Sequence, residues 1–133
     1  MKALLFSLIL VFSICFTTHA QSVQTATKSG DAIANSGTSD ISMNLQKEKY
    51  SLISFQIVIT KVSGTFAGTT VLQASNDGTN WQTVGDTTLT HANQTTNSLL
   101  WKISSPAYSQ YRTHSAGSGT MNATPVAYIR LTK

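Results

Sequence analysis

The sequence contains one cysteine, two prolines and few charged residues, which make up 11% of the chain. A single cysteine cannot form a disulfide within the chain, and Cys15 lies in the apolar N-terminal stretch. The residue before it is a bulky isoleucine, which disfavours lipid attachment at this cysteine. The 9 Lys and Arg residues exceed the 5 Asp and Glu residues and give a net charge of +4. Because the basic residues form no run or stripe, the composition argues against nucleic-acid binding.

Residues 1–20 have the pattern of a secretory signal peptide. A basic Lys2 precedes an apolar run over residues 3–16, and small or polar residues follow as far as Ala20. The run is shorter than the roughly 20 apolar residues that a membrane span needs. We therefore predict a signal peptide that is cleaved between Ala20 and Gln21. The mature chain would be exported through the inner membrane, to the periplasm, the extracellular space or a virion surface, with no stable membrane anchor.

Helix signals are nearly absent from the rest of the chain, whereas strand signals are dense. No window places apolar residues at helical spacing with capping residues at its ends. Short runs of β-branched residues are separated by glycine and asparagine instead. Residues 21–40 are polar and small, and we expect a lead-in segment that is either loose or an edge strand. We assign residues 41–133 to the folded domain.

The strongest strand pattern lies at residues 50–59. Ile53, Phe55, Ile57 and Ile59 occupy alternate positions, so period-two geometry puts all four on the core face. Further strands are expected at residues 41–45, 69–75, 81–84, 87–90, 99–103, 108–114 and 126–131. Seven or eight short strands at this spacing predict a single all-β domain, an antiparallel β-sandwich of jelly-roll type.

Two turns are indicated by their residues. Asp77 and Gly78 suit backbone positions with positive φ, so the segment Asn76–Asn80 predicts a hairpin between the strands on either side. The glycine- and serine-rich residues 115–120 are expected to join the last two strands as a pair.

The sequence also repeats itself once. Ser63–Val71 aligns with Ser118–Val126 at a constant offset, and the Ser, Gly, Thr, later Thr and Val residues coincide. The repeat indicates either two related hairpins, one in each half of the sandwich, or turn chemistry that a chain rich in serine and threonine shares by composition.

Side chains suited to catalysis are scarce. We expect Asp77 to be occupied by its turn and the other acids to be solvated in loops, so no carboxylate pair is available. The mature sequence has no Gly-x-Ser-x-Gly motif, and His91 and His114 show no zinc-ligand spacing. The segment Asn76–Asn80 lacks the alternating acids of a calcium loop. We therefore expect neither an enzyme nor a bound metal or other cofactor.

Aromatic side chains remain as candidates for binding, because exposed Trp and Tyr stack on sugar rings and anchor protein interfaces. An alternative role for the tryptophans is in the core, with Trp81 closing it beside the hairpin and Trp101 packing within its strand. Alternation places Tyr108, Arg112 and His114 on one strand face. The candidate interface or ligand contacts are Trp81, Trp101, Tyr108, Tyr111 and Arg112.

Several segments together resemble a known group of proteins. Val71–Val84, with its Ser-Asn-Asp-Gly-Thr-Asn-Trp hairpin, resembles the strand–turn–strand unit of small discoidin-like β-sandwiches. Residues 50–133 as a whole are similar to small jelly-roll proteins of bacteriophages and prophages, through Ser63–Thr65, Gly68–Trp81, Tyr108–Arg112, Gly117–Thr120 and Val126–Leu131. The loops that hold ligands in discoidin lectins cannot be matched in this chain, so no binding residue is carried over.

The resemblance implies a virion surface, spike or decoration protein that acts by self-assembly and host-surface attachment. Its partners would be further copies of itself or other virion proteins. A signal peptide is unusual in phage structural proteins, and it fits either assembly at the cell envelope or a secreted bacterial protein built on the same module. The alternative function is that of a secreted carbohydrate-binding module, a discoidin-like lectin with cell-surface glycans as ligands.

Overall fold

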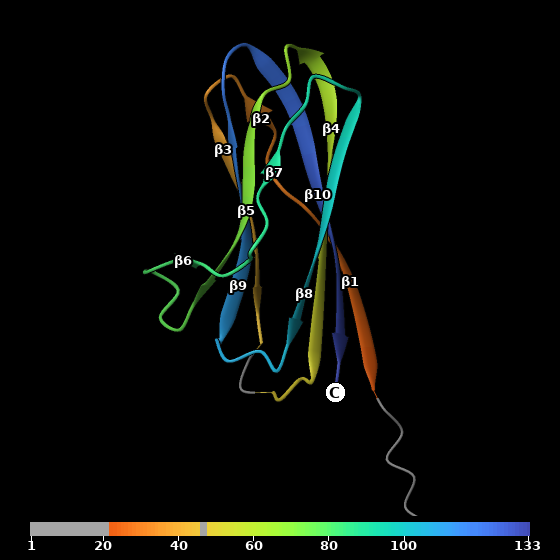
Figure 1. Ribbon diagram of the computed structural model, residues 1–133, viewed down its shortest axis with the longest axis vertical. Helices are drawn as coiled ribbons and strands as arrows, with labels where there is room; N and C mark the ends of the chain where they lie inside the picture. The colour runs from red at the N-terminus through yellow and green to blue at the C-terminus, as the bar shows by residue number, and fades with distance from the viewer. Residues whose placement is uncertain (1–21, 46–47) are drawn as a thin grey trace, which may run out of the picture.

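The computed structural model describes residues 22–45 and 48–133. Within these residues the chain forms two antiparallel β-sheets packed face to face and no helix (Figure 1). The predicted all-β sandwich is therefore confirmed. The predicted signal peptide, with its cleavage site at Ala20 and Gln21, lies outside the described residues. No helix of the described chain is long and apolar enough to span a bilayer.

Each sheet has five strands. Sheet A has the order β1–β10–β4–β8, with β2 also paired to β10, and its strands are β1 (Val23–Ser29), β2 (Ile33–Ala34), β4 (Leu52–Gly64), β8 (Thr96–Ser104) and β10 (Met121–Thr132). Sheet B has the order β3–β9–β5–β6, with β7 also paired to β5, and its strands are β3 (Thr38–Asn44), β5 (Gly68–Ser75), β6 (Gln82–Thr83), β7 (Leu89–Thr90) and β9 (Gln110–Gly117). The two strands beyond the eight expected are β1 and β2, which lie in the segment that was expected to be a lead-in.

The chain changes sheet at most of its connections. From β2 to β5 it alternates between the sheets at every step, and from β7 to β10 it does so again. Consecutive strands therefore face each other across the core instead of pairing edge to edge, which is the jelly-roll-like arrangement.

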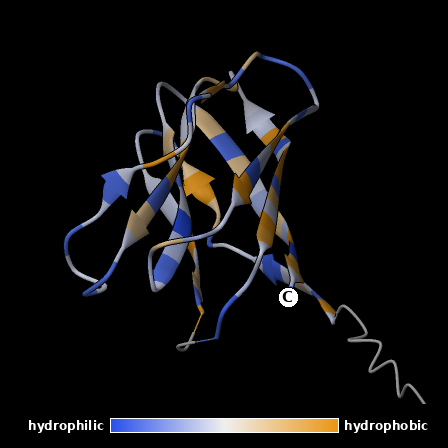
Figure 2. Cartoon of the chain, turned by 60° about the horizontal axis from the view of Figure 1, so that its bottom comes forward, coloured by the Kyte–Doolittle hydropathy of each residue, from blue (hydrophilic) through white to orange (hydrophobic). Residues whose placement is uncertain are grey.

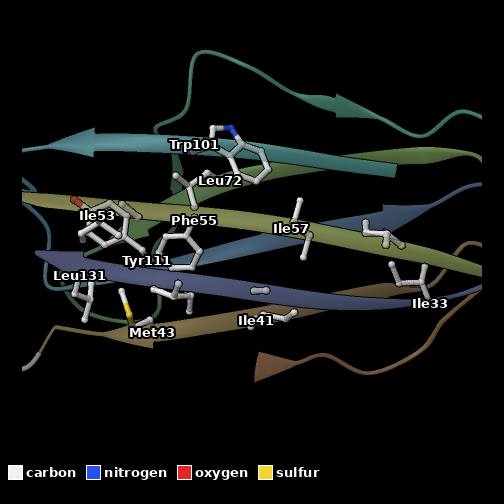
Figure 3. Packing of buried hydrophobic residues seen from close by; sticks show 14 of the residues in the cluster. Ile33, Ile41, Met43, Ile53, Phe55, Ile57, Leu72, Trp101, Tyr111 and Leu131 are labelled. Carbon is white, nitrogen blue, oxygen red and sulfur yellow. The ribbon is translucent and has the colours of Figure 1, made fainter. Parts of the chain in front are cut away.

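Alternating apolar residues build the core between the two sheets. The four inward positions predicted for β4 are completely buried, and they are Ile53, Phe55, Ile57 and Ile59. Leu72 and Tyr111 from sheet B meet this row across the sandwich (Figure 3). The outward positions are mostly polar, so apolar and polar residues alternate along the longer strands (Figure 2).

The predicted pairing of the last two strands is wrong. β9 pairs with β3 and β5 in sheet B, whereas β10 pairs with β1 and β4 in sheet A. The turn at residues 118–120 therefore crosses between the sheets. The physical reason is that β9 and β10 each carry an apolar face, and crossing the sandwich buries both Tyr111 and Ile129 from opposite sides of one core. The predicted hairpin around Asp77 is confirmed, because β5 and β6 are paired.

The internal repeat corresponds to two sheet crossings and not to two hairpins. Ser63–Val71 leads from β4 in sheet A to β5 in sheet B, and Ser118–Val126 leads from β9 in sheet B to β10 in sheet A. The two crossings are hydrogen-bonded to each other, since the Thr65 backbone N–H donates to the Thr120 carbonyl oxygen at 2.7 Å.

The segment expected to be a lead-in contributes strands to the sandwich. β1 pairs with β10 along its whole length, so this part of the segment is an edge strand and not a loose lead-in. The expected start of the folded domain, residue 41, falls inside β3. Every residue of β1 is exposed, so the backbone ladder with β10 rather than core packing holds this strand. Lys28 adds one link to the other sheet, because its Nζ donates to the Ser42 carbonyl oxygen at 2.7 Å.

Candidate binding surface

The outer face of sheet B brings together polar and aromatic side chains from distant parts of the chain. The strand register places Asp40 of β3 beside His114 of β9, and Arg112 of β9 beside Gln73 of β5. These residues alternate with the buried positions of their strands, so they point outward. Trp81, which follows the β5–β6 turn, completes a group that we call the Arg112 cluster: Asp40, Gln73, Trp81, Arg112 and His114.

Arg112 lies at the centre of this cluster, and three neighbours orient its guanidinium. Its Nε donates to Gln73 Oε1 at 2.8 Å, and its Nη1 donates to Asp40 Oδ2 at 2.9 Å. The guanidinium also lies over the ring of Trp81, 4.3 Å from the ring centroid. The Arg112 side chain keeps 20% of its surface exposed. A guanidinium held in this way loses little conformational entropy when its remaining N–H groups bind a ligand.

Asp40 links the arginine to a histidine. Its Oδ1 lies 2.5 Å from His114 Nδ1, while its Oδ2 is bound by Arg112. An ionised carboxylate only accepts hydrogen bonds, so Nδ1 carries the proton of the imidazole and Nε2 is an acceptor when the ring is neutral. The cluster therefore presents both donors and acceptors on one face.

The hairpin between β5 and β6 sets the position of Trp81. Asp77 Oδ1 accepts hydrogen bonds from the backbone N–H groups of Thr79 and Asn80 at 2.8 Å, and its Oδ2 accepts from the Asn80 side-chain amide at 2.7 Å. These bonds, the one from the Asn80 side chain above all, hold the pKa of the Asp77 carboxyl well below its usual range. Trp81 Nε1 donates back to the Gly78 carbonyl oxygen at 3.2 Å, so the indole is tied to the same turn.

The structure separates the candidate contact residues of the sequence into two groups. Trp81 and Arg112 lie together at the surface, and Trp81 is half-buried there instead of closing the core. Trp101 and Tyr111 are 5% and 1% exposed, so these two predicted contacts belong to the core and are out of reach of a surface ligand. Their strands place them at inward positions, where the large rings fill the space between the sheets.

Tyr108 also departs from its expected place. It precedes β9, which begins at Gln110, so it does not share the outward strand face with Arg112. Its side chain is exposed, and its ring packs edge-on against Tyr111 with the centroids 6.1 Å apart. Tyr108 therefore lies outside the Arg112 cluster.

Two members of the cluster, Asp40 and Gln73, are not identified by any sequence pattern. Each occupies a polar position of an alternating strand, as any solvent-facing residue does. They reach Arg112 because β3 and β5 pair with opposite edges of β9. The only signal in the sequence is the alternation of apolar and polar residues, which shows that Asp40 and Gln73 face outward. This alternation does not indicate which strands are neighbours.

A second polar group lies inside the sandwich. His91 Nε2 is 2.8 Å from Thr70 Oγ1, and this hydroxyl donates to Ser115 Oγ at 2.8 Å. All three residues are buried, and burial lowers the pKa of His91, so its ring is kept neutral. Because the group has no access to solvent, we assign it to the packing of the core. Among residues 22–45 and 48–133, no three His, Cys, Asp or Glu side chains are grouped so that they could hold a metal ion.

Comparison with known proteins shows that this chain is similar in fold to several solved structures. No protein-family model matches the chain, and no curated protein matches it. The Yersinia pseudotuberculosis-derived mitogen superposes with a TM-score of 0.50 at 11% identity, covering 84% of this chain and 86% of the mitogen. A chain from the disulfide-linked pili of Bacillus endospore appendages gives a TM-score of 0.51 at 15% identity, covering 89% of this chain and 95% of the pilus chain. These structural neighbours are jelly-roll or β-sandwich proteins, and in fold this chain is one as well.

Proposed function

We propose that this protein is an exported, non-enzymatic adhesive protein that binds neutral carbohydrate through the Arg112 cluster. The observation that carries the proposal is the orientation of Arg112 by Gln73, Asp40 and Trp81 on an outer sheet face. Guanidinium, carboxylate, amide and imidazole groups together supply the donors and acceptors that sugar hydroxyls pair with. The guanidinium covers one face of the Trp81 indole, and the rest of this half-buried ring is the apolar surface left for contact with a sugar.

The charges of the cluster favour a neutral ligand. Asp40 and Arg112 form an ion pair with an N–O distance of 2.9 Å, so their charges compensate each other. An anionic ligand would have to compete with Asp40 for the guanidinium. Sugar hydroxyls can donate to the carboxylate and accept from the guanidinium while the ion pair stays intact.

The test measures binding of the purified secreted protein to immobilised neutral oligosaccharides of glucose, galactose, mannose and xylose. Trp81→Ala and Arg112→Gln should each weaken binding about tenfold or more, as expected for central contact residues. Lys49→Gln, which removes an exposed cation outside the Arg112 cluster, should leave binding to these sugars unchanged. Retention of none of the sugars, equal binding by all three variants, or cleavage of the bound oligosaccharide would overturn the proposal.

Export is tested separately by the N-terminus of the protein recovered outside the cytoplasm. A chain that begins at Gln21 supports export with removal of the signal peptide, and a chain that keeps Met1 contradicts it.

A second candidate function, that of a phage virion surface, spike or decoration protein, is supported by β1. β1 is the end strand of sheet A, and its free edge pairs with no other strand of the described chain. An exposed strand edge can add to the sheet of another copy, which is one route to self-assembly. Mass spectrometry of purified phage particles should then detect the chain, and light scattering should show an oligomer. A strictly monomeric protein would count against this function.

A further inference from the structure

The outer face of sheet A carries a second surface with different chemistry. Arg130 of β10, Ser54 of β4 and Lys102 of β8 lie side by side across three neighbouring strands, and we call them the basic row. Neighbouring strands are about 4.8 Å apart, so the two cationic side chains rise from backbone positions roughly 10 Å apart. Both cations are exposed, and neither forms an ion pair with another residue of the described chain.

Two adjoining hollows lie over this part of the sheet. One has a volume of about 420 Å³ and lies over the basic row. The other has a volume of about 370 Å³ and reaches the next row of the sheet, formed by Tyr128, Gln56 and Leu100. Arg130 and Ser54 line both hollows, so the two are continuous. Each volume lies within the range of roughly 300–1,000 Å³ that is typical of ligand sites.

The basic row has no acidic residue to balance it. No Asp or Glu lines either hollow. Asp40 is bound to Arg112 on the opposite sheet, Asp77 is held within its turn, and Glu48 is paired with Lys133. Two positive charges at this separation repel each other, and an anion placed between them would be attracted by both.

The rest of the lining suits a sugar ring. Tyr128 and Leu100 are each 47% exposed on the outer face of the sheet, in one row on either side of Gln56, so they offer apolar surface within the hollow. The hydroxyls of Thr25, Thr27 and Ser54 and the amide of Gln56 line the same hollow and can pair with sugar hydroxyls. A purely apolar partner would leave these polar groups without hydrogen bonds.

We propose that this face of sheet A binds an acidic carbohydrate, with a carboxylate or sulfate group between Arg130 and Lys102 and a sugar ring against Tyr128 and Leu100. This site is separate from the Arg112 cluster, since it lies on the other sheet and favours an anionic ligand, whereas the cluster favours a neutral one. An acidic sugar and a neutral one could therefore bind to the two faces of the same molecule.

The test uses a galacturonic acid hexamer and a sulfated galactose oligomer as acidic probes, and the methyl-esterified galacturonate hexamer as the matched neutral probe. At least one acidic probe should bind, and binding should weaken as sodium chloride is raised, whereas the ester should not bind to this face. Arg130→Gln and Lys102→Gln should each weaken acidic binding about fivefold or more. Lys49→Gln removes an exposed cation outside both hollows and should leave binding unchanged.

The outcomes separate this proposal from the proposed function. Trp81→Ala should not affect acidic probes, and Arg130→Gln should not affect neutral oligosaccharides. If either cation variant unfolds, Tyr128→Ser tests the same site through its ring and should weaken acidic binding as well. The proposal is overturned if neither acidic probe binds, if the ester competes equally, or if Lys49→Gln weakens binding as much as Arg130→Gln. Binding to phosphatidylglycerol vesicles without binding to acidic sugars would also overturn it, in favour of a lipid surface.

Discussion

Gly64 and Gly119 occupy equivalent positions in the two crossings between the sheets, with φ of +75° and +82°. Both lie in the left-handed region that glycine adopts without strain. Phe66 and Met121, each two residues further along, are buried at 1% and 3% exposure. The repeated sequence thus builds the same bend twice and sends an apolar side chain into the core after each one.

The two glycines should respond differently to alanine. A Cβ at Gly64 would lie 2.2 Å from the Thr120 carbonyl oxygen, whereas nothing lies within 4 Å of the corresponding position at Gly119. Gly119→Ala should therefore cost only the backbone strain, about 1 kcal/mol, and Gly64→Ala should cost at least about 1 kcal/mol more. Urea denaturation of the two variants measures the difference. Equal destabilisation would show that the crossings are not packed as described.

The stability of the fold should depend on pH through His91. Burial lowers the pKa of His91 below its usual 6.5. The His91 ring takes up a proton near pH 6.5 in the unfolded chain but only at lower pH in the folded chain. The stabilising contribution of the neutral, buried ring is therefore fully present above pH 6.5 and is lost as pH falls through the lower folded pKa. The free energy of unfolding, measured by urea between about pH 7.5 and 4.5, should decline in this direction. His91→Gln should flatten the slope, and an unchanged slope in this variant would refute the assignment.

The turn at Asp77 should keep its structure in moderate acid. Its hydrogen bonds lower the pKa of the carboxyl below the usual 3.8, so their stabilising effect is present above that pH and is lost only as pH falls through the lower folded value. The amide signals of Thr79 and Asn80, followed by NMR, should stay unchanged as pH drops past 3.8. Asp77→Asn should shift the side-chain amide signals of Asn80 at neutral pH, because the amide nitrogen that replaces Oδ2 cannot accept the hydrogen bond from Asn80 Nδ2. A titration midpoint near 3.8 in the native protein would contradict this prediction.

The loss of stability on replacing an aromatic residue by alanine should depend on how deeply that residue is buried. Trp101 is in the core and donates its Nε1 proton to the Thr87 carbonyl oxygen at 2.8 Å, and Tyr111 is buried in the same core cluster. Trp101→Ala and Tyr111→Ala should each reduce the free energy of unfolding by about 3–5 kcal/mol. Trp81→Ala should reduce it much less, because Trp81 packs at the surface against Arg112. Denaturant unfolding measures all three, and a large loss for Trp81→Ala would place that residue in the core.

Local patterns predicted what depends on neighbours in the chain. Alternation of apolar residues correctly indicated the buried face of β4, because a strand that covers a core repeats with period two wherever it pairs. The residues Asp77 and Gly78 indicated their hairpin, because the turn is closed by bonds within a few residues. The same reasoning paired β9 with β10 wrongly. A glycine-rich turn shows that the chain reverses, but it does not show whether the next strand returns to the same sheet.

The amino-acid sequence by itself determined that the folded domain is all-β and which side of its main strands is apolar, because both follow from residue type and spacing. It did not determine which strands are neighbours. Arg112 meets Asp40 and Gln73, and Arg130 lies in one row with Lys102, only through the register of strands that are far apart in the chain. Register is set by the packing of the whole core, since a shift of one residue would turn every buried side chain outward. Both proposed binding faces are therefore products of the tertiary structure.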